Sequence, residues 1–185
     1  MKKGFTLTET LVVVALIAIT LSIGLPALSS FRERIQARQS ATELHQLISY
    51  TRSQSILLAQ RVTLCPLDNS NACSSDWNGP LSVFTDLNNN RVMDADETLL
   101  KVMSAVQSSN ELRAFNSKVI SFDHLGFAGF NNGTLSYCLN GATTSGSAYI
   151  ISRNGRMRLA GDKNNDGLPE LLNGKTIDCP AAGNL

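Results

Sequence analysis

The sequence predicts an α+β protein in which a long N-terminal helix packs on a C-terminal antiparallel β-sheet or β-sandwich domain. Three observations lead to this fold class. Residues 5–28 are almost wholly apolar, residues 29–61 carry apolar side chains at helical spacing, and residues 62–185 alternate short β-prone runs with Gly, Asn, Asp and Ser. A chain of 185 residues is long enough for one such helix and one globular domain with its own core.

The first part of the helix, residues 5–28, has the length and hydrophobicity of a membrane-spanning segment. Between Lys3 and Arg32 the only ionisable side chain is Glu9. Lys2 and Lys3 precede the apolar run, and positive charge favours the cytoplasmic side of a membrane. The rest of the chain is therefore expected on the far side of that membrane.

A cleaved secretory signal peptide is the alternative interpretation of this segment. Its basic region would hold only two lysines, its small residue, Gly4, precedes the apolar run, and a carboxylate interrupts that run. These features argue against the alternative. The sequence Leu25-Pro26-Ala27 offers a weak small-residue cleavage site, so the alternative stays open at this stage.

Glu9 lies within the apolar segment, where an unpaired carboxylate is energetically costly. A cut between Gly4 and Phe5 would create an α-amino group about one helical turn from Glu9. The terminal ammonium of a neighbouring subunit could then pair with Glu9 and set the stagger between packed helices. Such a pair is strong in apolar surroundings, and breaking it leaves a buried charge unpaired.

Residues 29–61 are expected to continue the helix as an amphipathic segment on which the globular domain packs. The apolar stripe consists of Ile35, Ala41, Leu44, Leu47, Ile48 and Leu58. Beyond Arg61, turn-forming residues separate short β-prone runs. The expected strands are Val62–Leu64, Leu81–Thr85, Thr98–Val106, Val119–Phe122, Gly133–Leu139, Ala148–Ile151 and Met157–Leu159.

The segment Lys3-Gly4-Phe5-Thr6-Leu7-Thr8-Glu9, followed by an apolar helix, resembles the class III leader of type IV pilins and type II secretion pseudopilins. Later landmarks resemble the GspH/FimT group of minor pilins and pseudopilins, and their cysteine pattern is closer to FimT and FimU than to GspH. These landmarks are Cys65-Pro66, Cys73, Trp77-Asn78-Gly79, Phe84-Thr85-Asp86 and Asp178-Cys179-Pro180. The resemblance implies that residues 1–4 are a leader cleaved after Gly4 by a prepilin peptidase. It also implies that Phe5 is N-methylated.

The resemblance further implies a minor pilin of a type IV pilus, which helps to prime assembly at or near the tip with other major and minor pilins. The chain would be a single-pass protein of the bacterial inner membrane with a periplasmic C-terminal domain, and it would then enter an extracellular filament. The competing function is that of a GspH-like minor pseudopilin in a type II secretion system. Neither function requires a cofactor, and none is expected.

The four cysteines of the chain permit three pairings, and disulfides persist in the oxidising periplasm. We favour Cys65–Cys73, which closes a turn-rich loop, and Cys138–Cys179, which ties the C-terminal tail to a strand. A zinc site is the alternative. Its usual Cys-x-x-Cys spacing is absent, and neither histidine lies near a cysteine in the sequence.

Two loops carry oxygen-bearing side chains at the spacing of EF-hand calcium loops. In the first, position six is Arg91 where glycine is expected, and in the second, position twelve is Asn173 where a carboxylate is expected. The alternative, which we prefer, is an Asx-rich turn between strands. The candidate ligands are Asp86, Asn88, Asn90, Asp94 and Glu97 in the first loop and Asp162, Asn164, Asp166 and Glu170 in the second.

The strongest candidate for a binding site in the domain is the segment Arg153-Asn154-Gly155-Arg156-Met157-Arg158. The net charge of the chain is only +1, which excludes DNA binding through overall charge, so that any such affinity must come from a local patch. If Gly155 lies in a turn, Arg156 and Arg158 point to one face of the next strand. Two guanidinium groups there could hold successive phosphates of a DNA backbone, independently of sequence and with strong salt dependence.

The Gly155-Arg156-x-Arg158 pattern resembles the C-terminal motif of FimT proteins, which is associated with DNA capture in natural transformation. The resemblance nominates Arg156 and Arg158, with Arg153 as a helper and Lys163 and Lys175 as weaker candidates. No aromatic residue is interleaved with these arginines, which favours double-stranded DNA over base stacking. The alternative is that the arginines pair with Asp162, Asp166, Asp178 or a neighbouring pilin.

An enzyme is disfavoured by the positions of the two histidines. His45 lies on the expected helix, away from any nucleophile in sequence. Asp123 and His124 stand beside an expected strand and a Gly-rich turn. The presence of Ser121 near His124 is a coincidence of sequence and does not indicate a catalytic triad.

Overall fold

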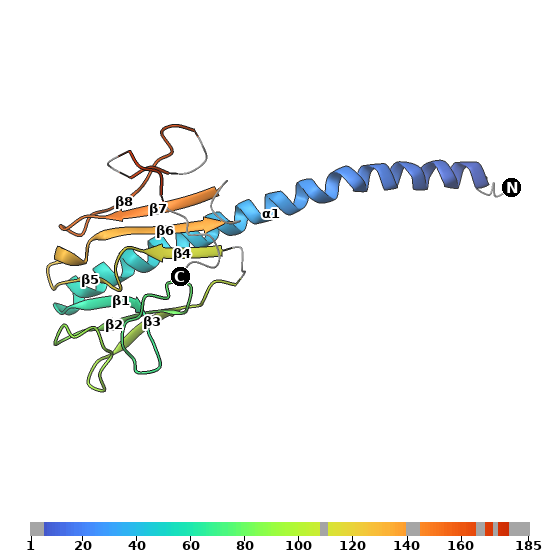
Figure 1. Cartoon of the computed structure of the whole chain (residues 1–185). Coiled ribbons are helices and arrows are strands. Elements are labelled where there is room, and N and C mark those ends of the chain that lie inside the picture. Colours follow the sequence, from blue (N-terminus) through green and yellow to red (C-terminus); the bar gives the residue numbers. More distant parts are fainter. Residues whose placement is uncertain (1–5, 108–110, 140–144, 166–168, 172–173, 178–185) are drawn as a thin grey trace. The chain divides into compact units, whose positions relative to one another are not determined.

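The computed structural model describes residues 6–107, 111–139, 145–165, 169–171 and 174–177, and for residues 23–27, 29–30, 33–34, 36–37, 139 and 145 it describes the backbone alone. The chain forms helix α1 (Leu7–Leu58), strands β1 (Val62–Pro66), β2 (Leu81–Thr85), β3 (Leu99–Met103), β4 (Glu111–Phe115) and β5 (Ile120–Phe122), the short helix η1 (Gly129–Asn131), and strands β6 (Gly133–Leu139), β7 (Ser145–Ile151) and β8 (Met157–Leu159) (Figure 1). It divides into two compact units, Met1–Ser40 and Ala41–Leu185.

In the first unit, α1 begins with a capped turn. The backbone N–H of Glu9 donates to Thr6 Oγ1 at 3.3 Å, and that of Thr10 donates to the Thr6 carbonyl at 3.2 Å. Thr6 and Glu9 therefore stand at the N-cap and N3 positions of a capping-box sequence, where a carboxylate also complements the helix dipole. The sequence analysis did not identify this local role of Glu9.

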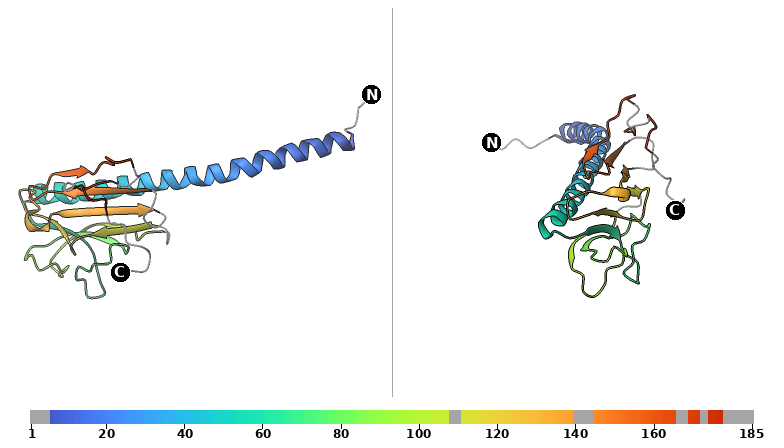
Figure 2. Two further views of the ribbon diagram at one scale, coloured as in Figure 1. Left: turned by 45° about the horizontal axis from the view of Figure 1, so that its top comes forward. Right: turned by 90° about the vertical axis from the view of Figure 1, so that its left-hand side faces the viewer.

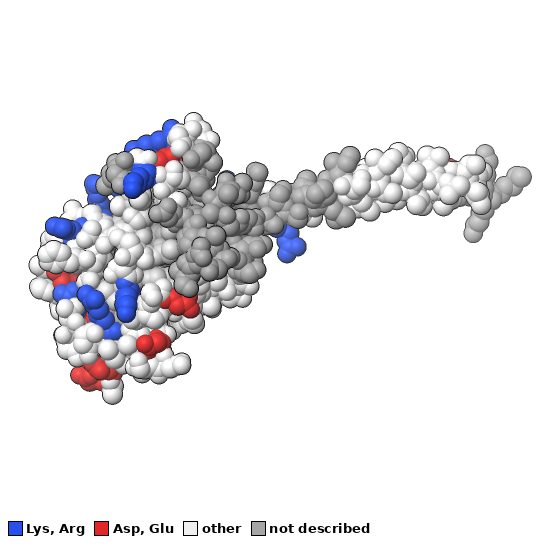
Figure 3. All heavy atoms as spheres, in the orientation of Figure 1, with Lys and Arg blue, Asp and Glu red and all other residues white. Residues whose placement is uncertain are grey.

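The apolar side chains of this first unit are exposed in the single chain. They include Leu11, Val12, Val13, Val14, Leu16, Ile17, Ile19 and Leu21. Figure 3 shows the described surface of this part of the helix almost without charged atoms. No helix within the described residues has the length and hydropathy required to cross a membrane.

The second unit contains the C-terminal part of α1, and here one side of the helix is buried. The buried residues recur every three or four positions: Ala41, Leu44, Leu47, Ile48, Thr51 and Ser55. Two expected members of the stripe, Ile35 and Leu58, are instead exposed. The stripe is completed by Thr51, whose hydroxyl donates to the Leu47 carbonyl at 2.8 Å and so satisfies its own polar group inside the core.

Two antiparallel four-stranded sheets, of order β3-β2-β1-β5 and β4-β6-β7-β8, form the rest of the second unit. The helix runs along these sheets (Figure 2). The expected α+β fold class is confirmed, and each of the seven expected strands is present. Strands β2, β6 and β8 have the expected bounds, and the other four have shifted ends. The register of the second sheet pairs Leu112 with Cys138 and Ser136 with Ala148.

Strand β4 was not predicted, because its charged residues lie on the inside. Glu111 and Arg113 are only 4 % and 2 % exposed and Leu112 between them is also buried, so this part of the strand shows no alternation of buried apolar and exposed polar residues. Arg113 Nη2 lies 3.1–3.2 Å from the carbonyl oxygens of Asn78, Gly79 and Ser104. These contacts tie β4 to two loops of the other sheet, while burial lowers the pKa of the Arg113 guanidinium.

Tyr149 links the second sheet to the helix. Its hydroxyl donates to the Ala41 carbonyl at 2.8 Å, and its ring lies 5.6 Å from the ring of His45. Burial raises the pKa of the Tyr149 hydroxyl, because the charged phenolate would be poorly solvated there.

The predicted disulfide Cys65–Cys73 is confirmed, and both cysteines are buried beside Phe84 and Val119. The loop that it closes is held by Asp68, whose Oδ1 accepts the Ser70 hydroxyl and the N–H groups of Ser70 and Ala72. These hydrogen bonds, above all those of Ser70, lower the pKa of the Asp68 carboxyl. The loop is therefore fixed by both a covalent bond and an Asx turn.

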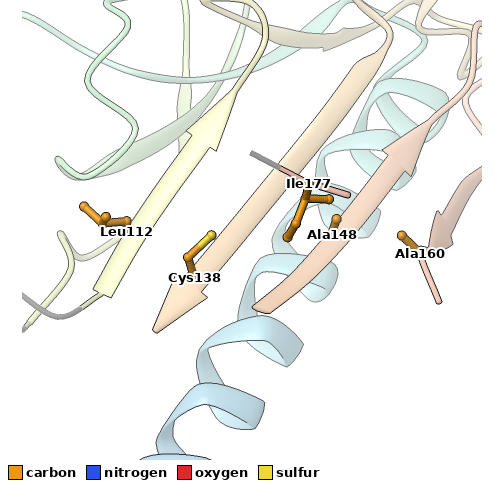
Figure 4. Close-up of a cluster of buried hydrophobic side chains, with 5 residues drawn as sticks. All are labelled: Leu112, Cys138, Ala148, Ala160 and Ile177. Atoms are coloured by element: carbon orange, nitrogen blue, oxygen red, sulfur yellow. The ribbon is translucent and has the colours of Figure 1, made fainter. Parts of the chain in front are cut away.

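The outer face of the second sheet carries a small apolar cluster made by Leu112, Cys138, Ala148, Ala160 and Ile177 (Figure 4). Ile177 comes from the C-terminal segment and lies over β6 and β7 (Figure 4). Cys179, the expected partner of Cys138, lies outside the described residues. The pairing stays a prediction, supported by the burial of Ile177, two residues before Cys179, in the cluster that contains Cys138.

Candidate functional site

The arginine cluster, defined as Arg153, Arg156 and Arg158, is built on the hairpin between β7 and β8. Ile151 pairs with Met157, and the turn between them closes through hydrogen bonds from Gly155 N to the Ser152 carbonyl (2.8 Å) and from Ser152 N to the Arg156 carbonyl (3.0 Å). Gly155 has φ +75°, a conformation that favours glycine. The expected turn is present, but β8 begins at Met157, so Arg156 immediately precedes the strand and Arg158 lies on it.

This turn is fixed by contacts with two other segments. Arg52 on α1 donates from Nε to the Gly126 carbonyl at 3.0 Å and from Nη2 to the Asn154 carbonyl at 3.4 Å. A Cβ atom at position 155 would lie 1.9 Å from the Gly126 carbonyl oxygen. The two backbones are therefore in contact, and only glycine fits at position 155.

The side chains of the arginine cluster are exposed. Within the described part of the chain, none of the three guanidinium groups makes a hydrogen bond or an ion pair. Pairing with Asp162 is thereby excluded as the explanation of the cluster, while Asp166 and Asp178 lie outside the described residues. Of the weaker candidates, Lys163 and Lys175 are both exposed.

An aromatic side chain from a separate segment of the sequence lies beside the cluster. Phe130 is on η1, and the Arg153 guanidinium carbon lies 5.3 Å from the centroid of its ring. The N–H groups of Ala128 and Gly129 both donate to the Arg153 carbonyl at 3.0 Å, which joins the two segments. The expectation that no aromatic accompanies the arginines is corrected, because Phe130 approaches Arg153 through tertiary structure and not through the local sequence.

The expected processing site, Gly4 and Phe5, lies outside the described residues. Glu9 is described and exposed, in the first turn of α1. Its carboxylate is thus accessible to a group from another molecule at the start of the apolar segment.

The first calcium-like loop is held together by its own side chains. The amide nitrogens of Asn88 and Asn90 donate to Asp94 Oδ2 at 2.9 and 2.8 Å. Both Glu97 oxygens accept backbone N–H groups, and Asp86 Oδ2 accepts the Thr63 hydroxyl at 2.9 Å. Arg91 adopts φ +64°, the left-handed conformation for which glycine was expected. These contacts describe an Asx-rich turn.

In the second loop, Asp166 lies outside the described residues and Glu170 is buried. Glu170 Oε2 accepts the backbone N–H of Lys163 at 2.6 Å, so this carboxylate closes the loop that contains Asp162 and Asn164. Among the residues that the structure describes, no three His, Cys, Asp or Glu side chains are placed to hold a metal ion.

The residues weighed for catalysis are engaged in structural contacts. Ser121 is buried, and its hydroxyl lies 2.9 Å from that of Thr63. Asp123 Oδ1 accepts the N–H groups of Leu125 and Phe127, both at 2.9 Å, which fixes the loop that leads to η1. His45 packs against Tyr149.

Comparison with known proteins gives two family matches. Residues 40–155 match the family described as type II transport protein GspH, and residues 1–25 match the prokaryotic N-terminal methylation motif. No curated protein sequence matches the chain.

Among solved structures, the chain resembles two crystal forms of the type IV minor pilin FimU of Pseudomonas aeruginosa PAO1. The first shares 22 % identity with a TM-score of 0.56, covering 71 % of this chain and 92 % of FimU. The second shares 21 % identity with a TM-score of 0.53, covering 67 % and 92 %. At this identity the likeness supports the fold alone.

Proposed function

The chain belongs to the GspH family of pilins and pseudopilins and begins with the prepilin methylation motif, and from this premise we propose that it is a minor pilin of a type IV pilus. In this proposal, a prepilin peptidase cuts after Gly4 and Phe5 is N-methylated. Residues 5–28 hold the chain in the inner membrane and later enter the core of the filament, while the domain faces the periplasm.

One observation supports this proposal above the others. The first unit of α1 exposes apolar side chains along its length in the single chain, and Glu9 is its only ionisable residue before Arg32. Such a surface is stable when lipid or neighbouring helices cover it, and a lone carboxylate is retained there when it is paired. The terminal ammonium of a neighbouring subunit is the proposed partner of Glu9.

The test compares a deletion strain with its complemented form. Sheared filaments and membranes are probed with an antibody against the domain, and piliation is scored by electron microscopy. We expect the chain in the filament fraction and reduced piliation in the deletion strain. A chain confined to the membrane fraction in a normally piliated deletion strain would contradict the proposal.

We further propose that the arginine cluster binds the phosphate backbone of DNA without regard to sequence and serves DNA uptake in natural transformation. The support is geometric: the three exposed guanidinium groups are on and beside one rigid turn, and none is neutralised by a described carboxylate. Each phosphate contact releases counterions, so affinity should fall steeply with salt.

Replacing both Arg156 and Arg158 with Gln tests this second proposal. We expect the double variant to lose DNA binding at low salt in a gel-shift assay and to reduce the slope of log affinity against log salt by about 1 to 2. Arg91→Gln, an exposed arginine in the 86–97 loop, is the matched control and should bind as the unaltered chain does. Unchanged binding by the double variant would refute DNA contact at this turn.

The matched family, described as type II transport protein GspH, favours a second candidate, a minor pseudopilin of a type II secretion system. Secreted exoproteins would then be lost in the deletion strain, while piliation and transformation would stay normal. Measuring both phenotypes in the same strain separates the two functions.

A further inference from the structure

Phe130 is the most exposed of the large apolar side chains that the structure describes, at 90 %. The Arg153 guanidinium lies over its ring, 5.3 Å from the centroid, within the range of a cation–π contact. The remainder of the ring is open to solvent. The exposed ring and the exposed guanidinium beside it are therefore both accessible to a ligand at this turn.

The two segments that carry these groups are held together by backbone hydrogen bonds. Hydrogen bonds from Ala128 and Gly129 to the Arg153 carbonyl fix the start of η1 against the turn, and Asn131 N donates to the Ala128 carbonyl at 2.9 Å. Arg52 holds the opposite side of the same turn. The segments that carry the ring and the guanidinium therefore need little backbone ordering before they bind a ligand.

We propose that Phe130 and Arg153 form a stacking platform for an unpaired nucleobase, so that the site prefers single-stranded DNA over a duplex. This inference rests on the DNA binding proposed above and specifies the form of DNA. Every base has a π-face, so stacking tolerates any sequence. In a duplex the base faces are covered by their neighbours, and only edges and phosphates are presented.

The charges around the ring favour a nucleic acid over a protein as its partner. A protein interface that buried Phe130 would also cover the Arg153 guanidinium that lies over its ring. Burying this cation is costly unless the partner supplies an anion, and within the described residues no carboxylate of this chain pairs with it. A single strand meets both needs, because its phosphates pair with the arginines while a base covers the ring.

The test uses the full chain in mild detergent with labelled oligonucleotides of one sequence, single-stranded or as a duplex, in fluorescence anisotropy. Phe130→Leu keeps an apolar side chain but removes the flat face, and Phe130→Trp restores one. Leu125→Ala, which removes an exposed apolar side chain from the same loop, is the matched control. A strand carrying 2-aminopurine reports stacking directly through quenching of its fluorescence.

We expect Phe130→Leu to weaken single-strand binding about tenfold, which is about 1.4 kcal/mol. Duplex binding should change less than twofold, the salt slope should stay constant, and Trp should restore both affinity and quenching. Equal losses for both forms of DNA, or no loss for either, would overturn the inference. In the second case, loss of binding by the Arg156 and Arg158 double variant would show that the proposed DNA function still stands.

Two further results would also be decisive. If the unaltered chain binds neither form of DNA, the DNA function and the platform fail together. If Phe130→Leu leaves DNA binding intact but removes the chain from filaments, the ring contacts another subunit and the inference is wrong.

Discussion

The two units of α1 use apolar side chains in opposite ways. Between Ala41 and Ser55 the apolar residues recur on one side and are buried by the sheets of the same chain, whereas between Leu11 and Leu21 they are exposed in the single chain. The second stretch, from Ala41 to Ser55, thus contributes to the stability of the domain. The apolar side chains of the first stretch, from Leu11 to Leu21, are not covered by the described part of their own chain, and in the proposed filament neighbouring helices would cover them.

The largest effect is expected from the lone acid of the first stretch. Glu9→Gln removes the proposed pairing with a neighbouring N-terminus, and breaking a buried ion pair costs about 3–5 kcal/mol. Recovery of the chain in sheared filaments, measured by immunoblot, should fall more than about a hundredfold. The control is Glu43→Gln, which changes an exposed acid in the second stretch and should leave assembly normal. Equal losses for both variants would contradict the special role proposed for Glu9.

Removing a core side chain should have the opposite pattern. Leu44 is fully buried, so Leu44→Ala should destabilise the domain by about 2–5 kcal/mol. Leu16 is 58 % exposed in the single chain, and Leu16→Ala should change stability in detergent by less than about 0.5 kcal/mol. Urea unfolding followed by circular dichroism measures both. A large effect at Leu16 would show that the first stretch packs within its own chain.

Two glycines sharpen the comparison within the domain. Gly155 and Gly174 have φ +75° and +77°, but a Cβ at 155 meets the Gly126 carbonyl, whereas one at 174 meets nothing within 4 Å. Gly174→Ala should cost about 1 kcal/mol from backbone strain alone. Gly155→Ala should cost at least about 2 kcal/mol and should weaken DNA binding, because the turn must move. Equal destabilisation in thermal unfolding would show that the close approach has no energetic consequence.

The smallest effect concerns the hydroxyl of Tyr149. Because its pKa is raised in the fold, the stabilisation is complete below about pH 10 and is lost as pH rises through the raised pKa. Tyr149→Phe should cost about 1 kcal/mol at neutral pH by removing the bond to Ala41, and its stability should fall less between pH 9 and 11. Parallel pH profiles for the two proteins would contradict this assignment.

Much of the fold was predictable because its signals are local. The apolar run, the helical stripe, seven strands and the Cys65–Cys73 bridge each follow from short sequence patterns. Strand β4 was missed because Glu111 and Arg113 are buried together with Leu112, so the strand lacks the alternation of apolar and polar residues by which a strand is recognised. The ends of the stripe were also misplaced, since Thr51 and Ser55 are buried where apolar residues were sought.

The candidate site was predictable to a smaller extent. The Gly155 turn and its exposed arginines were predicted from their spacing. The supporting Arg52 and the ring of Phe130 were not, because they approach the turn from segments far away in the sequence. Among the features that were not predicted, the capping-box pattern of Thr6 and Glu9 is the one that the local sequence would have revealed.

The account depends most on the fate of the first stretch of α1, and mass spectrometry of the chain purified from sheared filaments tests it directly. The predicted mature chain begins at Phe5 with one added methyl group on its α-amino nitrogen and keeps the whole apolar stretch. A chain that begins at Leu25 or later would contradict the account, because the stretch proposed to enter the filament would have been removed.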